Sequence, residues 1–152
     1  MTADTLVLGI GNLLLGDEGV GVRVVEALQS GPPLPGGVTC LDGGTGSLVL
    51  LEPMQAVRRL ILVDATLDGR PAGTLTRLTP RYAADYPASL SAHDIGLRDL
   101  LDIFHIGEHG VPEVVLFAIS VEEIADLSVA LSPAVAAAVP GVVAAIRMEL
   151  GQ

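Results

Sequence analysis

Leu6–Ile10, with the sequence LVLGI, is a run without one polar side chain, and Gly11 follows it directly. Such a run is typical of a strand buried on both faces, as in the middle of a parallel sheet. A helix is expected next, from about Asp17 to Gln29, because Val20, Val24 and Leu28 recur on one helical face. A buried strand followed by an amphipathic helix indicates the first unit of an α/β fold.

The same alternation of strands and helices continues along the chain. We expect further strands at Val38–Leu41, Arg59–Val63 and Val114–Ile119, and helices that begin at Ser47, Asp94 and Ser132. Thr74–Leu78 alternates polar and apolar side chains, which predicts a half-exposed strand at a sheet edge. The last helix is expected to be broken or kinked near Pro140. With no repeat or linker in view, residues 1–152 are expected to form a single domain.

Composition limits the classes of function. The chain has 152 residues and a net charge of −10, which argues against nucleic acid and anionic membrane surfaces as partners. It has no lysine, so Schiff-base chemistry is excluded. Cys40 is the single cysteine, so no internal disulfide can form and a reducing, cytoplasmic setting is favoured.

One segment has the length of a membrane span. Residues 127–146 form 20 positions without a charged side chain. The segment contains Pro133 and Pro140, and much of its bulk is alanine, which contributes little transfer free energy. We therefore expect a buried helix and no membrane span, and the N-terminus lacks the positive charge of a signal peptide.

Three side chains with metal-binding chemistry lie where strands end or helices begin. Glu18 closes the run Gly9–Glu18, Asp64 follows an apolar strand, and His93 precedes a predicted helix. In an open α/β sheet, ligands bind at the rim formed by the carboxyl ends of the strands. One imidazole and two carboxylates form an open ligand set for a divalent transition metal. We therefore expect Glu18, Asp64 and His93 to be both metal ligands and catalytic residues.

Each of these acids also has a simpler structural role. An acid in the first turn of a helix is stabilised by the helix dipole, and we favour that role for Asp17. Asp42 precedes two glycines and could close a turn, while Asp64 could cap one, and both alternatives stay open. However, Glu18, Asp42 and Asp64 on one rim would repel one another, which is usually tolerated for a cation or for proton chemistry. Asp42 is therefore a fourth candidate catalytic residue, and His93 gains its significance only together with Glu18 and Asp64.

The glycines at positions 9 and 11 suggest a dinucleotide site, but the pattern fails. The fingerprint needs a third glycine where this chain has Leu14. The predicted helix also opens with Asp17 and Glu18, and their negative charges would repel a pyrophosphate.

A second motif, His105–His109, matches the H-x-x-E-H pattern of zinc peptidases. Gly107 lies inside the pattern and Gly110 follows it, so a helix end is the better interpretation. Nucleophilic catalysis has little support, because no G-x-S-x-G elbow occurs and Cys40 lies within an apolar strand, where a thiol is usually inert.

The motifs at these positions resemble those of one known family, the maturation endopeptidases of NiFe hydrogenases. The matching runs are Gly9–Gly21, Asp42–Thr45, Val63–Ala65 and Ser91–His93. The first run is specific to the family, and the others support it by their order and spacing. The resemblance covers residues 6 to about 98.

The resemblance implies a fold and an activity. The fold is a three-layer α/β/α sandwich with a five-stranded, mostly parallel mixed sheet, whose antiparallel strand is Thr74–Leu78. The activity is removal of a short C-terminal extension from the hydrogenase large-subunit precursor after nickel insertion. The implied metal ligands are again Glu18, Asp64 and His93.

The resemblance further implies that nickel in the precursor serves as a recognition signal, so the substrate itself would supply the metal. Zinc or cadmium could occupy the same ligands, and Gly43 and Gly44 would let the precursor backbone approach closely. The large-subunit precursor is the implied partner, and a monomer is compatible with the size.

Two alternatives remain open at the level of sequence. Glu18 is either a metal ligand or a general base. The chain is either an endopeptidase or a non-catalytic metal-binding or assembly factor that docks on the precursor.

Overall fold

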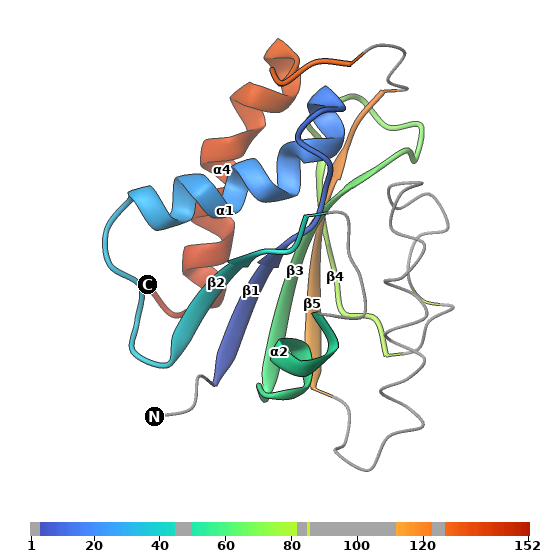
Figure 1. Cartoon of the computed structure of the whole chain (residues 1–152). Helices are drawn as coiled ribbons and strands as arrows, with labels where there is room; N and C mark the ends of the chain where they lie inside the picture. The colour runs from blue at the N-terminus through green and yellow to red at the C-terminus, as the bar shows by residue number, and fades with distance from the viewer. Residues whose placement is uncertain (1–3, 45–49, 82–84, 86–111, 123–126) are drawn as a thin grey trace.

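The apolar runs of the sequence form one five-stranded sheet in the computed structural model, which describes residues 4–44, 50–81, 85, 112–122 and 127–152. The strands follow one another in the order β2-β1-β3-β5-β4 across the sheet (Figure 1). Their bounds are β1 Thr5–Gly9, β2 Val38–Asp42, β3 Arg59–Thr66, β4 Leu75–Leu78 and β5 Glu113–Ser120.

The sheet is mixed and mostly parallel, as predicted. β1 pairs in parallel with β2 and β3, and β3 pairs in parallel with β5. β4 is antiparallel to β5 and lies at the edge of the sheet, which confirms the half-exposed edge strand. β3 and β5 lie between other strands, and all but their first residues are buried.

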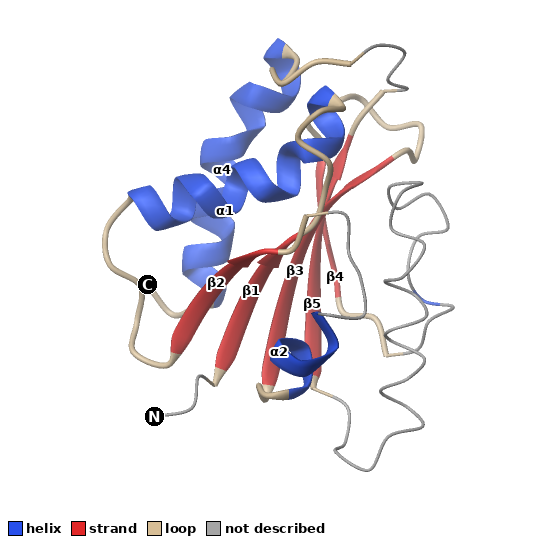
Figure 2. Ribbon diagram, viewed as in Figure 1, coloured by secondary structure: helices blue, strands red, loops and turns tan. Residues whose placement is uncertain are grey.

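Helices cover the sheet on its two faces (Figure 2). α1 (Val20–Ser30) and α4 (Pro133–Glu149) pack against each other on one face, and the short α2 (Leu51–Gln55) lies on the opposite face. The core is split accordingly, because successive strand side chains point to opposite faces. Ile61 and Val63 pack with the α1 and α4 side, and Leu60 and Leu62 pack with the α2 side. This confirms the three-layer α/β/α architecture.

The first helix begins differently from the prediction. A 3₁₀ turn, η1 (Gly16–Gly19), precedes the α-helix, which starts only at Val20. Gly16 has φ +55°, a left-handed conformation that glycine adopts readily and that an α-helix cannot contain. Glu18 therefore lies in a tight turn between β1 and α1 rather than on the surface of a regular helix.

Two further predictions concern helices. α4 is continuous from Pro133 to Glu149, so a break near Pro140 is wrong, and the alternative of a kink there stays a prediction. The buried residues of α4 are Val135, Val142 and Ile146, so the expected buried helix is buried on one face only. Pro140 is exposed, so the Ala136 carbonyl that loses its intrahelical partner lies where water can bind it. Ser47 as a helix start and the helix from Asp94 to Phe104 lie outside the described residues, and the described helix nearest to Ser47 begins at Leu51.

Within the described residues, no helix combines the length and apolarity that crossing a membrane requires.

Candidate active site

β1 and β2 end side by side on one rim of the sheet, next to β3, which continues past them. Gly9, the last residue of β1, pairs with Asp42 of β2 on one side and with Val63 of β3 on the other. From β1 the chain runs through α1 to β2, and the next strand, β3, lies on the far side of β1. The chain thus changes direction between β1 and β3, and in open α/β sheets ligands bind beyond the strand ends at such a point.

Asp64 lies at this point, inside β3 rather than after it. The predicted strand ended at Val63, but β3 continues to Thr66, and Asp64 pairs with Ala118 of β5 beyond the end of β1. Its side chain is fully buried, and its Oδ1 accepts a hydrogen bond of 2.8 Å from the N–H of Ala65. Because the strand continues, capping of a following turn is not the role of Asp64.

Glu18 approaches the same rim through η1, and it is 8% exposed. The backbone of this turn packs almost directly against the backbone at the end of β1. A Cβ atom on Gly11 would lie 2.0 Å from the Glu18 carbonyl oxygen, and one on Gly21 would lie 2.2 Å from the Val63 carbonyl oxygen. Glycines at these two positions therefore let η1 and the start of α1 lie directly against β1 and β3. The structure brings Glu18 and Asp64 to one end of two adjacent strands.

Asp42 also ends a strand on this rim, but it is exposed. Its Oδ1 accepts a hydrogen bond of 2.8 Å from the N–H of Gly44, two residues on. That bond closes an Asx turn, which is the simpler of the two roles considered for Asp42. A catalytic role for Asp42 stays a prediction.

The two glycines after Asp42 differ in their surroundings. A Cβ atom on Gly43 would lie 2.9 Å from the end atoms of the Leu8 and Ile10 side chains and 3.1 Å from the Gly9 carbonyl oxygen, so packing within the protein leaves little room there. Gly44 has φ +54°, and a Cβ atom there would meet nothing within 4 Å. Of the pair, only Gly44 leaves open space beside the rim.

The sequence suggested that Asp17 acts within its own helix, but its side chain binds a distant residue instead. Its Oδ1 accepts a hydrogen bond of 2.7 Å from the N–H of Ser132, and its Oδ2 accepts one of 2.8 Å from the Ser132 hydroxyl. Ser132 is the residue that precedes α4, 115 positions further along the chain. The sequence predicted that a helix begins at Ser132, but no pattern in it indicated a hydrogen bond between Ser132 and Asp17.

His93 lies outside the described residues. Among the described residues no three histidine, cysteine or acidic side chains are grouped closely enough to hold a metal ion. The described part of the chain supplies two of the three predicted ligands, Glu18 and Asp64. Their chemistry fits a divalent cation, because two enclosed carboxylates in an apolar setting are stabilised by a positive charge, and an imidazole would complete an open ligand set.

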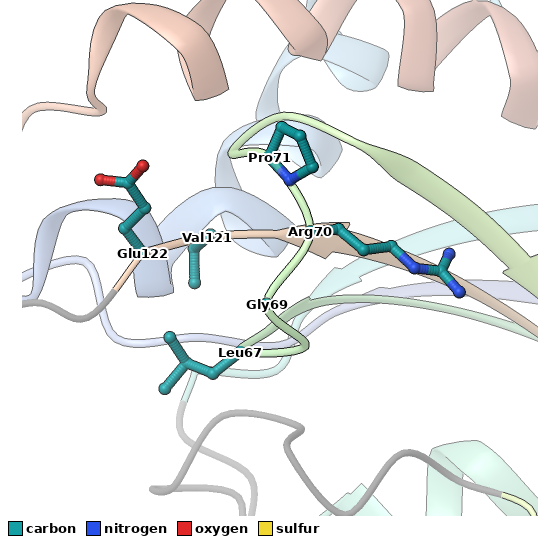
Figure 3. Close-up of a pocket in the computed structure, with 6 residues that line it drawn as sticks. All are labelled: Leu67, Gly69, Arg70, Pro71, Val121 and Glu122. Carbon is teal, nitrogen blue, oxygen red and sulfur yellow. The ribbon is translucent and has the colours of Figure 1, made fainter.

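A hollow adjoins the rim beyond the ends of β3 and β5 (Figure 3). Its volume is about 410 Å³, and its lining residues are Leu67, Gly69, Arg70, Pro71, Val121 and Glu122. The side chains of Arg70 and Glu122 point away from each other, and Arg70 donates a hydrogen bond of 2.7 Å to the Thr76 hydroxyl. The hollow therefore offers both polar and apolar surface beyond the ends of β3 and β5.

Cys40 is half-buried in β2. Burial raises the pKa of its thiol, and the nearby Arg147 offsets this only in part. A raised pKa reduces the fraction of nucleophilic thiolate, which agrees with the expectation that Cys40 is chemically inert.

The fold and the rim define a class of protein, an α/β protein with two buried acids beyond its central strand ends. Comparisons with known proteins are more specific. A family model described as hydrogenase maturation protease matches residues 22–149, a range that begins after Glu18 and includes Asp42, Asp64 and His93. On this match, the chain belongs to the hydrogenase maturation protease family.

Individual relatives agree with the family match. The hydrogenase expression/formation protein HupD of Rhodobacter capsulatus is 35% identical over 150 residues, which are 95% of this chain and 70% of that protein. The hydrogenase 2 maturation protease of Escherichia coli is 44% identical over 98 residues, which are 63% of this chain and 60% of that protein. The alignments thus span 60% and 70% of the length of these two relatives.

Solved structures support the same conclusion. The hydrogenase maturating endopeptidase HybD from E. coli matches with a TM-score of 0.87 and 33% identity. The match covers 97% of this chain and 91% of that chain.

Proposed function

We propose that this chain is an endopeptidase that removes the C-terminal extension of a NiFe hydrogenase large-subunit precursor after nickel insertion. Membership of the maturation protease family supports the reaction class. The observation that carries the proposal for this chain is the burial of Glu18 and Asp64 at the carboxyl ends of adjacent strands, 8% and 0% exposed. Enclosed acids at such a point are characteristic of a cation site or of proton-transfer chemistry.

The proposed ligands for a divalent ion are Glu18, Asp64 and His93. When bound, such an ion supplies Lewis acidity, which polarises a carbonyl group or lowers the pKa of water. Carboxylate and imidazole ligands suit nickel, zinc or cadmium, so the ligand types do not select among these metals.

The protein itself contributes position and enclosure. The glycine contacts at Gly11 and Gly21 hold η1 against the strand ends, so Glu18 is presented from a rigid turn. The strand pairing of Asp64 with Ala118 fixes the second acid in the sheet. Acids fixed in this way need little rearrangement when a metal or a scissile peptide binds.

Nickel enters the proposal as part of the substrate. The precursor would carry the ion to Glu18, Asp64 and His93, so that only a nickel-loaded precursor is cleaved. The hollow beyond the ends of β3 and β5 would accommodate the chain that flanks the scissile bond, since it offers both polar and apolar surface. We place the reaction in the cytoplasm, consistent with a chain whose single cysteine forms no internal disulfide.

Purified nickel-loaded precursor tests the proposal directly. Mass spectrometry after incubation with the wild-type chain is expected to show loss of a C-terminal peptide, and metal-free precursor is expected to stay intact. Binding of the precursor without cleavage would instead favour the non-catalytic assembly factor. Cleavage of metal-free precursor at the same rate would remove nickel recognition from the proposal.

The two roles open to Glu18 are separated by Glu18→Gln. Loss of both Ni²⁺ affinity and cleavage would identify Glu18 as a ligand. Loss of cleavage with unchanged affinity would identify it as a general base.

A further inference from the structure

η1, the turn that carries Glu18, is attached to a distant part of the chain, residues 128–132. The N–H of Gly16 donates a hydrogen bond of 2.6 Å to the carbonyl oxygen of Ser128, and Leu15 forms a parallel β-bridge with Ser128. The carboxylate of Asp17 accepts the two bonds from Ser132. The residue immediately before Glu18 is thus fixed by both of its side-chain oxygens.

The hydroxyl of Ser132 serves Asp17 rather than its own helix. Ser132 occupies the N-cap position of α4, where a serine side chain normally accepts a hydrogen bond from an N–H of the first helical turn. No such bond forms here, and the hydroxyl donates to Asp17 instead. The capping preference of serine therefore does not account for this arrangement.

An acid at position 17 has a geometric advantage over a neutral amide. A carboxylate accepts on both oxygens, so it can take the backbone N–H and the hydroxyl of Ser132 at once. Two bonds fix the plane of the carboxylate as well as its position, and the positive end of the α4 dipole favours its charge. Asp17 is 8% exposed and its bonds to Ser132 are partly buried, so water competes for them only in part.

We propose that Asp17 is a positioning residue, which acts with Ser132 to hold η1 in the one arrangement that places Glu18 correctly at the rim. The inference rests on the proposed function of Glu18. Adjacent Cα atoms are joined by a rigid peptide unit, so any displacement of Asp17 is passed directly to Glu18. A shift of about 1 Å in a catalytic group can lower a rate by about a hundredfold.

The test uses the full chain with four substitutions. Ser132→Ala removes the hydroxyl donor, and Asp17→Asn leaves one acceptor oxygen where there were two. Ser132→Thr keeps the hydroxyl and is the rescue variant. Val142→Ala is the stability control, because Val142 is buried in the same helix but lies far from Ser132 along it.

Three quantities are measured for each variant: kcat and KM for nickel-loaded precursor, Ni²⁺ affinity of the free chain by calorimetry, and the midpoint of thermal unfolding. We expect Ser132→Ala and Asp17→Asn to lower kcat and Ni²⁺ affinity by about 10- to 100-fold, as for other residues that orient a metal ligand, with little change in KM. Ser132→Thr should restore both values to within about threefold of wild type. Val142→Ala should lower the unfolding midpoint and leave kcat unchanged at a temperature where it is folded.

Several results would overturn the inference. One is a Ser132→Ala variant with wild-type kcat and Ni²⁺ affinity while the wild-type chain cleaves. Another is an equal loss of kcat in folded Val142→Ala, since that would reduce the effect to general stability. If the wild-type chain binds Ni²⁺ but cleaves nothing, the proposed function fails, and unchanged Ni²⁺ affinity in Ser132→Ala would then reject the positioning role separately.

Discussion

Gly9 at the end of β1 pairs with Val63 of β3, so Asp64 is the first residue of β3 to extend past its neighbouring strand. On its other side Asp64 still pairs with Ala118 of β5. Asp64 is therefore paired with β5 on one side, and on the other side it lies beyond the last paired residue of β1. η1 covers that end, since the Glu18 carbonyl oxygen packs directly on Gly11. A single difference in strand length thus brings an acid of the sheet and an acid of the following turn to one rim.

Neutral isosteres of the two rim acids test their role in cleavage. Asp64→Asn and Glu18→Gln keep the shape of each side chain but remove its charge. We expect each to lower kcat for nickel-loaded precursor by about 10²- to 10⁴-fold, the range for loss of a proton-transfer group. Mass spectrometry of the released peptide measures the rate.

Thermal unfolding is the control for these two variants, because Asp64 is fully buried. A variant whose unfolding midpoint lies well above the assay temperature is folded in the assay, so its kcat can be compared directly with that of the wild type. A folded Asp64→Asn variant with undiminished cleavage would remove Asp64 from the mechanism.

Asp42 provides a contrasting case on the same rim. Asp42→Asn keeps the Oδ1 acceptor that the Gly44 N–H uses, so the turn should survive. If Asp42 acts only in this turn, kcat of the variant should stay within about threefold of wild type. Asp42→Ala should lower the free energy of unfolding by about 1 kcal/mol through loss of the turn bond. A hundredfold loss of kcat in Asp42→Asn would instead establish Asp42 as catalytic.

Two glycine substitutions with opposite expected signs test the close packing of α1. In Gly21→Ala the new Cβ would lie 2.2 Å from the Val63 carbonyl oxygen, so we expect a loss of about 3 kcal/mol or more in unfolding free energy. Gly141 lies in α4, and a methyl group added there would meet nothing within 4 Å. Gly141→Ala should therefore raise the unfolding free energy by about 0.5–1 kcal/mol. Urea unfolding measures both, and equal effects would contradict the packing.

The ion pairs of Glu149 lead to a prediction of how the free energy of unfolding depends on pH. It ends α4 and accepts hydrogen bonds from Arg77, at 2.9 Å from Nε and 2.8 Å from Nη2, and a further bond from Arg59. The bond from Arg77 is the main reason that the pKa of the Glu149 carboxyl lies below its usual value. A carboxyl with a lower pKa when folded stabilises the protein above its unfolded pKa of about 4.3, and this stabilisation is lost as the pH falls through the folded pKa.

We expect Glu149→Gln to lower the unfolding free energy by about 1 kcal/mol at pH 7, since Arg77 is half exposed and its charge is screened. The difference from wild type should shrink as the pH falls below the unfolded pKa of about 4.3 towards the lower pKa of the folded carboxyl. Glu26→Gln is the matched control, because Glu26 pairs with Arg23 on the surface and such pairs contribute little. A constant difference from pH 7 to pH 3, measured by urea unfolding, would contradict the pKa argument.

The layers and strands could be predicted from the sequence because burial leaves local patterns. The uninterrupted apolar run Leu60–Val63 predicted a central strand, and the alternation in Thr74–Leu78 predicted the edge strand. The end of β3 was missed, because the charge of Asp64 resembles the start of a loop while its backbone still pairs with β5. The break at Pro140 was also wrong, because one lost hydrogen bond on a solvent-facing side of a helix is not enough to end it.

The positions of the acids at the rim could be predicted in part, because burial of the strands leaves a local pattern in the sequence. Strand ends are visible in the sequence, so Glu18, Asp42 and Asp64 could be placed on one edge of the sheet. The contact of Asp17 with Ser132 could not be predicted, because it joins two residues 115 positions apart and depends on how α4 packs. Nor did the sequence show that Gly43 serves internal packing against Leu8 and Ile10.

The hydrogen bonds between Asp17 and Ser132 have a consequence for how the chain folds during synthesis. On the ribosome, β1 and η1 are synthesised first, and Ser132, the partner that fixes Asp17, follows 115 positions later. Until then, the turn that carries Glu18 lacks its hydrogen bonds to residues 128–132. The rim of the sheet therefore takes its final form only after Ser132 has been added to the growing chain.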